Sequence, residues 1–224
     1  VNANLSGANV RSADLGDVNM KGINLSGADL NNTNLKGNDM TGANLENANL
    51  SGAILECNKG NRTKLAYANL KKANLTRANL KGVLLISAKL ADANLSEADL
   101  SPDNTERGRI IYIFYANLSG ANLSNVNLNK AKLYRAIFYR ANLNHAILTD
   151  AEMNDANLVM AQLMGANLTK ASLREANLQR ANLSNANLSN ADLVKSKLVD
   201  ANLTNAILKS ARLVDIATAK AVMA

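Results

Sequence analysis

Several residue types are almost missing from this chain. Tryptophan is absent, and the 224 residues include only two Phe, one Pro, one Cys and one His. A single cysteine excludes an internal disulfide and any zinc site built from several cysteines. No apolar run approaches the roughly 20 residues that a membrane-spanning helix needs. The sequence therefore predicts a soluble protein without membrane insertion, and it leaves the compartment, whether cytoplasmic, lumenal or periplasmic, open.

Three residue types dominate instead. The chain holds 37 Ala, 36 Asn and 35 Leu, nearly half of its length. Every fifth residue from Leu5 to Leu100 is Leu, Met or Val, with Gly60 as the exception, and the same spacing resumes in a new frame from Ile113 to Leu213. Ala usually stands two residues before each of these central positions, and Asn or Asp between them. The repeat period is therefore five.

A period of five fits neither a helix nor an ordinary strand, so it predicts a coil whose short straight segments point Leu and Ala inward. The pattern, as in Ala43-Asn44-Leu45 and Ala186-Asn187-Leu188, resembles the pentapeptide repeat family. That resemblance implies an all-β fold, a right-handed quadrilateral β-helix of about ten 20-residue coils. We expect a single domain over residues 1–224, with coils at 1–100, a loop at 101–112, coils at 113–213 and a C-terminal cap at 214–224.

The charged residues test the 20-residue coil independently. Residues that stack in neighbouring coils should carry opposite charges rather than like charges. At a separation of 20 the two repeat stretches contain twelve opposite pairs, including Lys36/Glu56 and Asp39/Lys59, and a single like pair, Asp155/Glu175. The sequence itself therefore supports four sides.

The repeat breaks in two places. At residues 56–60 a central position becomes Gly60 without loss of the five-residue frame, which indicates a bulge or a widened corner. At residues 101–112 eight residues more than one repeat stand between two central positions, and Pro, Asp, Asn and Gly favour a loop there. Six of the seven aromatic residues stand at the end of that loop or beyond it.

These aromatic residues allow two interpretations. Phe138 occupies a central position and belongs to the core, whereas Tyr134 and Tyr139 lie outside the coil and could be covered by the loop. Alternatively, tyrosines and arginines form an exposed interaction surface, since both are frequent at binding hot spots. The residues of that surface are Arg107, Arg109, Tyr112, Tyr115, Tyr134, Tyr139 and Arg140.

Catalysis requires groups that converge, and the sequence offers none. Cys57 and His145 lie four expected coils apart, which is about 19 Å along the rod. The acidic residues Asp150, Glu152 and Asp155 stack against basic residues rather than forming a calcium site. We therefore predict no enzymatic activity, no metal site and no cofactor.

The net charge of +7 raises the question of nucleic acid. Residues 57–149 carry 14 basic and five acidic side chains. Many of the basic residues have a carboxylate neighbour, and Arg62, Lys64 and Lys81 remain as a possible anion patch. Some members of the resembled family mimic DNA and bind type II topoisomerases, but those rods are acidic, whereas this chain is basic.

The prediction is therefore a non-enzymatic structural or protein-interaction scaffold, whose partner is another protein. The alternative is a basic nucleic-acid-associated module, or a modulator of a DNA-binding enzyme such as a topoisomerase. The chain starts within a repeat, so the first coil has no cap and allows end-to-end self-association. At the other end, Asp215 is expected to cap a short helix through Ile216, Ala219 and Met223.

Overall fold

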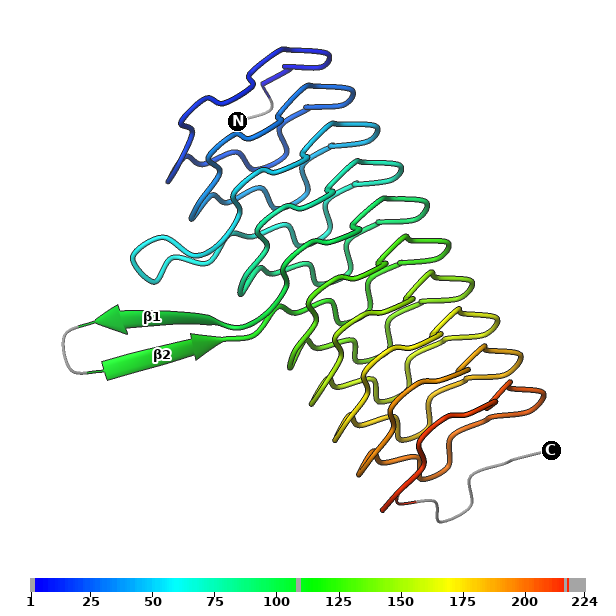
Figure 1. Cartoon of the computed structure of the whole chain (residues 1–224). Helices are drawn as coiled ribbons and strands as arrows, with labels where there is room; N and C mark the ends of the chain where they lie inside the picture. The colour runs from blue at the N-terminus through cyan, green and yellow to red at the C-terminus, as the bar shows by residue number, and fades with distance from the viewer. Residues whose placement is uncertain (1–2, 108–109, 216, 218–224) are drawn as a thin grey trace.

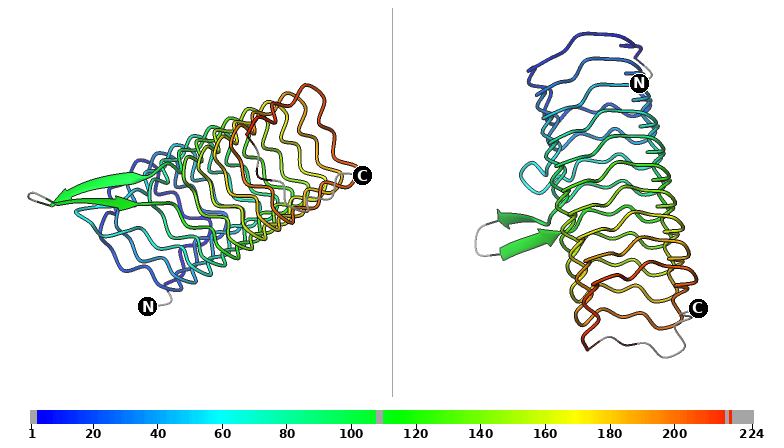
Figure 2. Two further views of the ribbon diagram at one scale, coloured as in Figure 1. Left: turned by 90° about the horizontal axis from the view of Figure 1, so that it is seen from below. Right: turned by 45° about the vertical axis from the view of Figure 1, so that its right-hand side comes forward.

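The computed structural model is a four-sided coil with a hairpin on one side (Figures 1 and 2). It describes residues 3–107, 110–215 and 217, and for residues 105–107 and 110–112 it describes the backbone alone. Two strands, β1 (Asp103–Arg107) and β2 (Ile110–Phe114), pair antiparallel. Apart from an antiparallel bridge between Asn58 and Asn61, the rest of the described chain pairs through single parallel bridges between successive coils. None of the described residues forms a helix long and apolar enough to cross a membrane.

The bridges define four sides, which we number in chain order. Sides 1 to 4 begin at Asn4, Asn9, Asp14 and Asn19, and each of these residues pairs with the residue 20 positions later. The two residues between neighbouring sides form the corners. The 20-residue coil expected from the charges is therefore present, except in two longer coils, across which the bridges on all four sides join residues 25 and 33 positions apart.

Leu and Ala fill the interior as expected. Almost all central Leu residues and the Ala residues two positions before them are fully buried between residues 28 and 201. Phe138 is also completely buried, so it belongs to the core. These side chains fill the interior, so the coil has a packed core rather than a pore. The core holds each coil against its neighbours.

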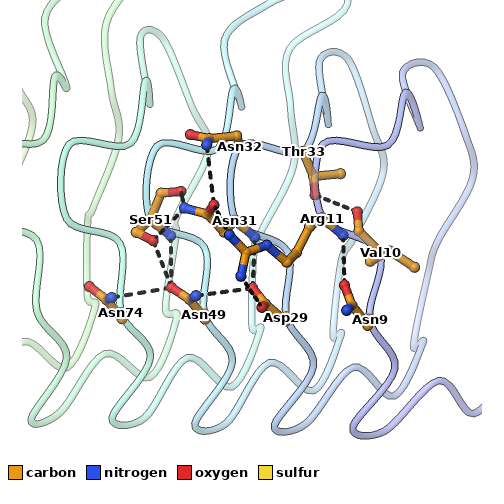
Figure 3. A network of polar contacts seen from close by, with 10 residues as sticks. All are labelled: Asn9, Val10, Arg11, Asp29, Asn31, Asn32, Thr33, Asn49, Ser51 and Asn74. Carbon is orange, nitrogen blue, oxygen red and sulfur yellow. Dashed lines mark hydrogen bonds and ion pairs between the residues drawn. The ribbon is translucent and has the colours of Figure 1, made fainter.

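The repeated Asn stabilises both its own turn and the next coil. In Asn44, Oδ1 accepts the Glu46 backbone N–H at 3.3 Å, and Nδ2 donates to Oδ1 of Asn24 at 3.2 Å. The same arrangement on side 2 links Asp29 to Asn49 and Asn74 (Figure 3). Asp can replace Asn as an acceptor but not as a donor. The middle position of the repeat is therefore polar for a structural reason.

Five of the twelve predicted charge pairs form ion pairs among the described residues, and one predicted pair is wrong. Ion pairs between residues 20 apart, at N–O distances of 2.7 to 3.9 Å, join Lys36/Glu56, Arg77/Glu97, Arg135/Asp155, Arg180/Asp200 and Asp192/Arg212. The predicted pair Asp39/Lys59 is wrong, because Asp39 stacks on Lys64 and their charged atoms lie 3.4 Å apart. The coil at this point is five residues longer than expected.

The other boundaries also shift. The expected loop at 101–112 contains most of the β1–β2 hairpin, and Ile113 belongs to β2, so the regular coil resumes near Ala116. At the C-terminus Ala217 pairs with Lys197, which continues the coil beyond the expected cap at Asp215. The predicted helix through Ile216, Ala219 and Met223 lies outside the described residues.

Candidate interaction surface

Both departures from the regular coil lie at the same corner, between sides 3 and 4. The first consists of residues 56–62, here called the loop, and makes Asp39 pair with a residue 25 positions later. The second, residues 101–115, contains the β1–β2 hairpin and makes Leu84 pair with Asn117, 33 positions later. A single regular turn, Lys81–Gly82, separates them. Both project from the same side of the rod (Figures 1 and 2).

The expected bulge at 56–60 is a tight hairpin turn. Asn58 and Asn61 exchange two backbone hydrogen bonds of 2.9 and 2.7 Å. Between them Lys59 and Gly60 have φ angles of 46° and 80°. Positive φ at both central residues defines a type I′ turn, the two-residue connection that suits the twist of a hairpin. The inserted residues are thus ordered by local geometry.

The loop folds back over the two preceding coils. The Asn58 side-chain amide donates to the Asp17 carboxylate. Gly37 lies beneath, and a Cβ there would overlap the same carboxylate. The buried Thr63 hydroxyl accepts the Gly37 N–H at 2.9 Å and donates to the Glu56 carbonyl at 3.0 Å. Thr63 stands where the repeat normally has Ala, because the widened corner leaves polar backbone groups that need partners.

Arg62 joins the loop to the hairpin. Its guanidinium donates to the carbonyl oxygens of Gly82 at 2.7 Å and Tyr115 at 2.5 Å, and it lies over the Phe114 ring at 5.3 Å. Burial lowers the pKa of Arg62, but the hydrogen bonds hold the cation in place. A second connection runs from the Cys57 backbone N–H to the Asp103 carboxylate at 2.9 Å. The two departures therefore form one connected unit.

Gly82 makes room for that unit. A Cβ at this position would lie 2.9 Å from the Asp103 Cβ, 3.1 Å from the Phe114 Cβ and 3.2 Å from the Cys57 Sγ. Such distances are shorter than ordinary carbon contacts of about 3.5–4.0 Å. The hairpin base can approach the rod this closely because the turn beneath it has no side chain.

Cys57 is not suited to chemistry. Burial, and next the negative charge of Asp103, raise the pKa of its thiol to about 12. A thiol with a raised pKa is a poor nucleophile because the thiolate is the reactive form. Over the residues that the structure describes, no cluster of three or more His, Cys, Asp or Glu side chains could hold a metal ion.

Two tyrosine–arginine pairs flank side 4 in the coil that follows the hairpin. Arg135 lies over Tyr134 at 5.0 Å at the same corner as the hairpin, and Arg140 lies over Tyr139 at 5.2 Å at the next corner. Each tyrosine is 37% exposed. The hairpin thus leaves both rings accessible. Ile137 lies between them on side 4.

The other residues of the predicted interaction surface are described to different extents by the structure. The Tyr115 side chain is half-buried at the hairpin base. Arg107 ends β1 and Tyr112 lies in β2, but their side chains, together with all of Arg109, lie outside the described part of the structure. The structure therefore brings Tyr115, Tyr134, Tyr139 and Arg140 to one region around side 4.

The three cations of the predicted anion patch are all engaged within the molecule. Arg62 is directed toward backbone carbonyls, as described above. Lys64 lies 3.4 Å from the Asp39 carboxylate, and Lys81 lies 3.6 Å from the Asp99 carboxylate. An incoming anion would have to compete with these partners, so the three residues do not form a free anion site.

Two shallow depressions follow the same corner. One, of about 310 Å³, lies between the loop and the hairpin base, and the other, of about 210 Å³, begins at Tyr134 and continues toward the C-terminus. The first is lined by Gly37, Gly60, Asn61, Arg62, Lys64, Leu84 and Phe114. Its lining combines the apolar side chains of Leu84 and Phe114 with polar and basic residues.

Positive charge concentrates in the same region. The segments that form side 4 and its corners around the two departures are 56–67, 81–87, 101–120 and 134–140, and together they hold eight basic and three acidic residues. The corresponding segments before them, 16–22 and 36–42, are neutral. The excess of basic residues in the sequence is therefore local to these segments, although Arg62, Lys64 and Lys81 among them are engaged within the molecule.

Sequence reasoning missed the residues that fix this surface in place. The sequence places Arg62 in a possible anion patch, whereas the structure places it at the hairpin base, and the repeat pattern gives Gly82 and Thr63 no special role. The Asn-Lys-Gly-Asn sequence at 58–61 was the available signal, since such residues favour hairpin turns.

The structure thus defines a class of protein: a four-sided β-helix built from five-residue repeats, with two insertions at one corner. The model of the family "Pentapeptide repeats" matches in eight copies that cover residues 19–56, 63–101, 116–155, 138–170, 161–198 and 171–209. The chain belongs to the pentapeptide repeat family, and the expected right-handed quadrilateral β-helix is confirmed. The gaps in the match coincide with the loop and the hairpin.

Solved structures of the same family are similar to this chain. One is HetL, a pentapeptide repeat protein involved in heterocyst differentiation regulation from the cyanobacterium Nostoc sp. strain PCC 7120, with 31% identity, coverage of 100% of this chain and 94% of that one, and a TM-score of 0.45. Another is QnrB1, a plasmid-mediated fluoroquinolone resistance protein, with 15% identity, 91% coverage of both chains and a TM-score of 0.45. A search of curated proteins found no match.

Proposed function

We propose that this protein is a non-enzymatic interaction scaffold that binds another protein through side 4, around the loop and the hairpin. The observation that carries the proposal is the coincidence of three features at this place. The regular coil is interrupted, tyrosines are exposed beside arginines, and positive charge is concentrated there. Tyr and Arg are enriched among the residues that contribute most to protein–protein binding.

The way the hairpin is attached supports this proposal. A rod of stacked coils needs neither departure, because each coil contacts only its neighbours. Nevertheless Arg62, Gly82 and the hydrogen bond from Cys57 to Asp103 fix the hairpin base against the corner. A surface ordered before binding loses less conformational entropy when a partner binds.

A deletion that preserves the rod tests the proposal. Replacing residues 101–115 by Ser-Gly recreates the regular turn found at Leu118-Ser119-Gly120-Ala121. A second variant carries Tyr134→Ala and Tyr139→Ala. Its matched control carries Ile147→Ala and Met164→Ala, because these side chains have similar exposure, 43% and 37%, away from side 4.

Proteins crosslinked to each variant in an extract of the native cells would be quantified relative to the unmodified chain. We expect the specific partner to be lost with the hairpin replacement, strongly reduced with the tyrosine variant and retained with the control. The proposal is wrong if the same proteins are recovered in equal amounts from all four chains.

Nucleic acid is the second candidate, and the local basic surface is the observation that favours it. Lys64, Lys81 and Arg135 in this region already form ion pairs with carboxylates in neighbouring coils. Binding of this kind would weaken steeply with salt, since counterions are released from the phosphates. Retardation of DNA or RNA at about 0.15 M salt, lost on hairpin replacement, would favour it over a protein partner.

A further inference from the structure

We propose that two copies of this chain associate side by side and antiparallel through the corner between sides 4 and 1, here called the apolar corner. It consists of the nine two-residue turns from Lys21-Gly22 to Val199-Asp200, all of which the structure describes. This inference goes beyond the proposed binding of another protein, because the occupant is a second copy of the chain and the contact needs neither the loop nor the hairpin.

Large apolar side chains gather at the apolar corner and are scarce at the other corners. Six of its 18 turn residues are Tyr, Ile, Val or Met, whereas the described turns between sides 2 and 3 have none and those between sides 1 and 2 have only Met164. Tyr67 is 65% exposed, more than any other large apolar side chain that the structure describes. Exposed apolar surface of this kind marks an interaction site. The six residues are Tyr67, Ile86, Tyr139, Val159, Met160 and Val199.

The apolar corner is also ordered. Each of its turns donates a backbone hydrogen bond of 2.9 to 3.1 Å to the turn above it, from Gly22 and Thr41 to Arg180 and Val199. The nine turns therefore form a straight column with a spacing of about 4.8 Å and a length of about 38 Å. A second column of the same kind can follow it over its whole length.

An antiparallel copy centred on the turn Ser119-Gly120 brings apolar residues together. This turn is the fifth of the nine, so a two-fold axis there places each turn opposite the turn equally far on the other side in the second copy. Tyr139 then lies opposite Ile86 of the second copy, and Met160 lies opposite Tyr67 of the second copy. The central turn has no large side chain, so the two columns can approach closely at the axis.

A shallow depression lies where the most exposed ring of the second copy would arrive. It has a volume of about 170 Å³ and begins at the turn Val159-Met160, which the two-fold axis places opposite Tyr67 of the second copy. The projecting ring of each copy therefore meets a hollow in the other copy. The depression is lined by Val159, Met160, Gln179, Arg180, Val199 and Asp200.

Charge decides the direction of the second copy. The charged turn residues of the apolar corner are Lys21, Arg140, Arg180 and Asp200. A parallel copy would place each of them level with its own counterpart, and like charges at an interface are unfavourable. The antiparallel copy places both arginines opposite uncharged turns and Asp200 opposite the turn of Lys21. Because Lys21 and Arg180 already pair with Asp39 and Asp200 of their own chain, charge sets the direction and apolar contact supplies the affinity.

This arrangement leaves side 4 of both copies accessible. A two-fold axis perpendicular to the rods keeps both copies of side 4 on the same side of the dimer. The hairpin precedes Asn117 in the coil that contains Ser119-Gly120, so the two hairpins lie at nearly the same level, each at the far edge of its own side 4. The dimer would thus present two interaction surfaces together, which raises the apparent affinity for a partner that has two matching segments.

Sedimentation equilibrium of the full chain at physiological salt tests this arrangement. Met160→Glu and Tyr67→Lys each place a charge in the apolar contact, and the double variant places opposite charges against each other. Within one chain these two positions lie four turns apart, about 19 Å, so they meet only across the antiparallel dimer. Tyr139 is left unchanged, because it also belongs to the proposed surface on side 4.

The substitutions suit the fold, and a matched control is present. Met160 and Tyr67 have φ angles of 59° and 60°, and Glu175 and Lys72 occupy equivalent turn positions with a φ of 58°. The rod therefore accommodates Glu and Lys at such positions. The control is Met164→Glu, which replaces a methionine that is 37% exposed at the corner between sides 1 and 2.

We expect the unmodified chain to dimerise with a Kd of roughly 10–100 μM, because the contact is long but narrow. Each single substitution should raise this Kd by at least about tenfold, since every apolar contact occurs twice in a symmetric dimer. The double variant should dimerise more tightly than either single variant. The control, and the variant in which Ser-Gly replaces residues 101–115, should dimerise like the unmodified chain.

Three outcomes would overturn the inference: a chain that stays monomeric at about 1 mM, a double variant that dimerises no better than the single variants, or a control that weakens the dimer as much as Met160→Glu. If the chain is monomeric and Met160→Glu reduces the recovery of a native protein, that protein occupies the apolar corner and a second copy does not. Neither Met160 nor Tyr67 lies at the hairpin or in a tyrosine–arginine pair, so these failures leave the proposed function standing. That function fails separately if the native partner ignores the hairpin.

Discussion

The substitution Gly82→Ala tests whether the hairpin is held against the rod as the structure indicates. Gly82 has a φ of 63° and lies beneath the hairpin base. Gly42 provides a matched control, because its φ is 68° and a Cβ there would contact nothing within 4 Å. Both substitutions place an alanine in the left-handed region, which costs about 1–2 kcal/mol. That cost is common to the two variants and cancels in their comparison.

The difference between the variants comes from contacts. At Gly82 the new methyl group would lie 2.9 Å from the Asp103 Cβ and 3.1 Å from the Phe114 Cβ, both on the hairpin. Overpacking of this kind typically costs about 1–3 kcal/mol when the surroundings cannot move. The free energy of unfolding should therefore fall by about 1–2 kcal/mol for Gly42→Ala and by about 2–5 kcal/mol for Gly82→Ala. Urea unfolding followed by circular dichroism measures both values.

A local measurement shows whether the hairpin moves instead. The only thiol of the chain, Cys57, lies against the hairpin base and is 9% exposed. If the hairpin relieves the overlap by moving outward, the loss of global stability will be smaller and a maleimide will label Cys57 faster in the Gly82 variant than in the Gly42 variant. Equal labelling rates together with equal unfolding free energies would refute the proposed packing of the hairpin.

Three further predictions concern single residues. Asp103→Asn removes a negative charge beside Cys57, so the pKa of the thiol should fall below about 12 and thiol labelling should start at lower pH. Burial disfavours ionised Asp192, but the Val194 N–H and two arginines outweigh it and lower the pKa of Asp192. The ionised Asp192 side chain therefore stabilises the fold fully above the ordinary pKa of Asp, and this stabilisation is lost as the pH falls through the lowered pKa of Asp192. In acid unfolding, the free energy of unfolding of Asp192→Asn should fall less with decreasing pH than that of the unmodified chain. Phe138→Leu should cost under about 1.5 kcal/mol in urea unfolding, whereas Phe138→Ala should cost about 3–5 kcal/mol, since Leu is the usual residue at that position.

The five-residue period predicted the rod well because each repeat position has one physical role. A Leu or Ala at the wrong phase would be exposed, so inward and outward positions can be assigned without coordinates. The same regularity concealed the loop. Its insertion adds five residues, one full repeat, so the frame at Leu55 and Leu65 is unchanged while the stacking partner of Asp39 shifts from Lys59 to Lys64. Periodicity alone cannot distinguish an extra repeat from an insertion of the same length.

The candidate surface was predictable only in part. The second break and its aromatic residues located the region, because Pro102 and the eight surplus residues cannot belong to a regular coil. The connection between the two departures was not predictable, since it requires knowing that both leave the rod at one corner. Arg62 illustrates the limit: its charge suggested exposure, whereas three carbonyl oxygens and the Phe114 ring hold it at the hairpin base.

The shared corner also explains how a repetitive rod can carry a specific surface. An insertion that leaves and re-enters the coil at one corner does not change which side any later repeat occupies, so the Leu and Ala layers continue undisturbed from Ala116 onward. Coils contact only their neighbours, and loop closure costs little more as a loop lengthens, so such insertions have local effects on stability. Two insertions separated by one regular turn can contact each other, whereas insertions at different corners cannot. The turn at Gly82 is therefore the position where the requirements of the rod and those of the interaction surface meet, and substitutions there should affect both the stability of the chain and binding at the hairpin.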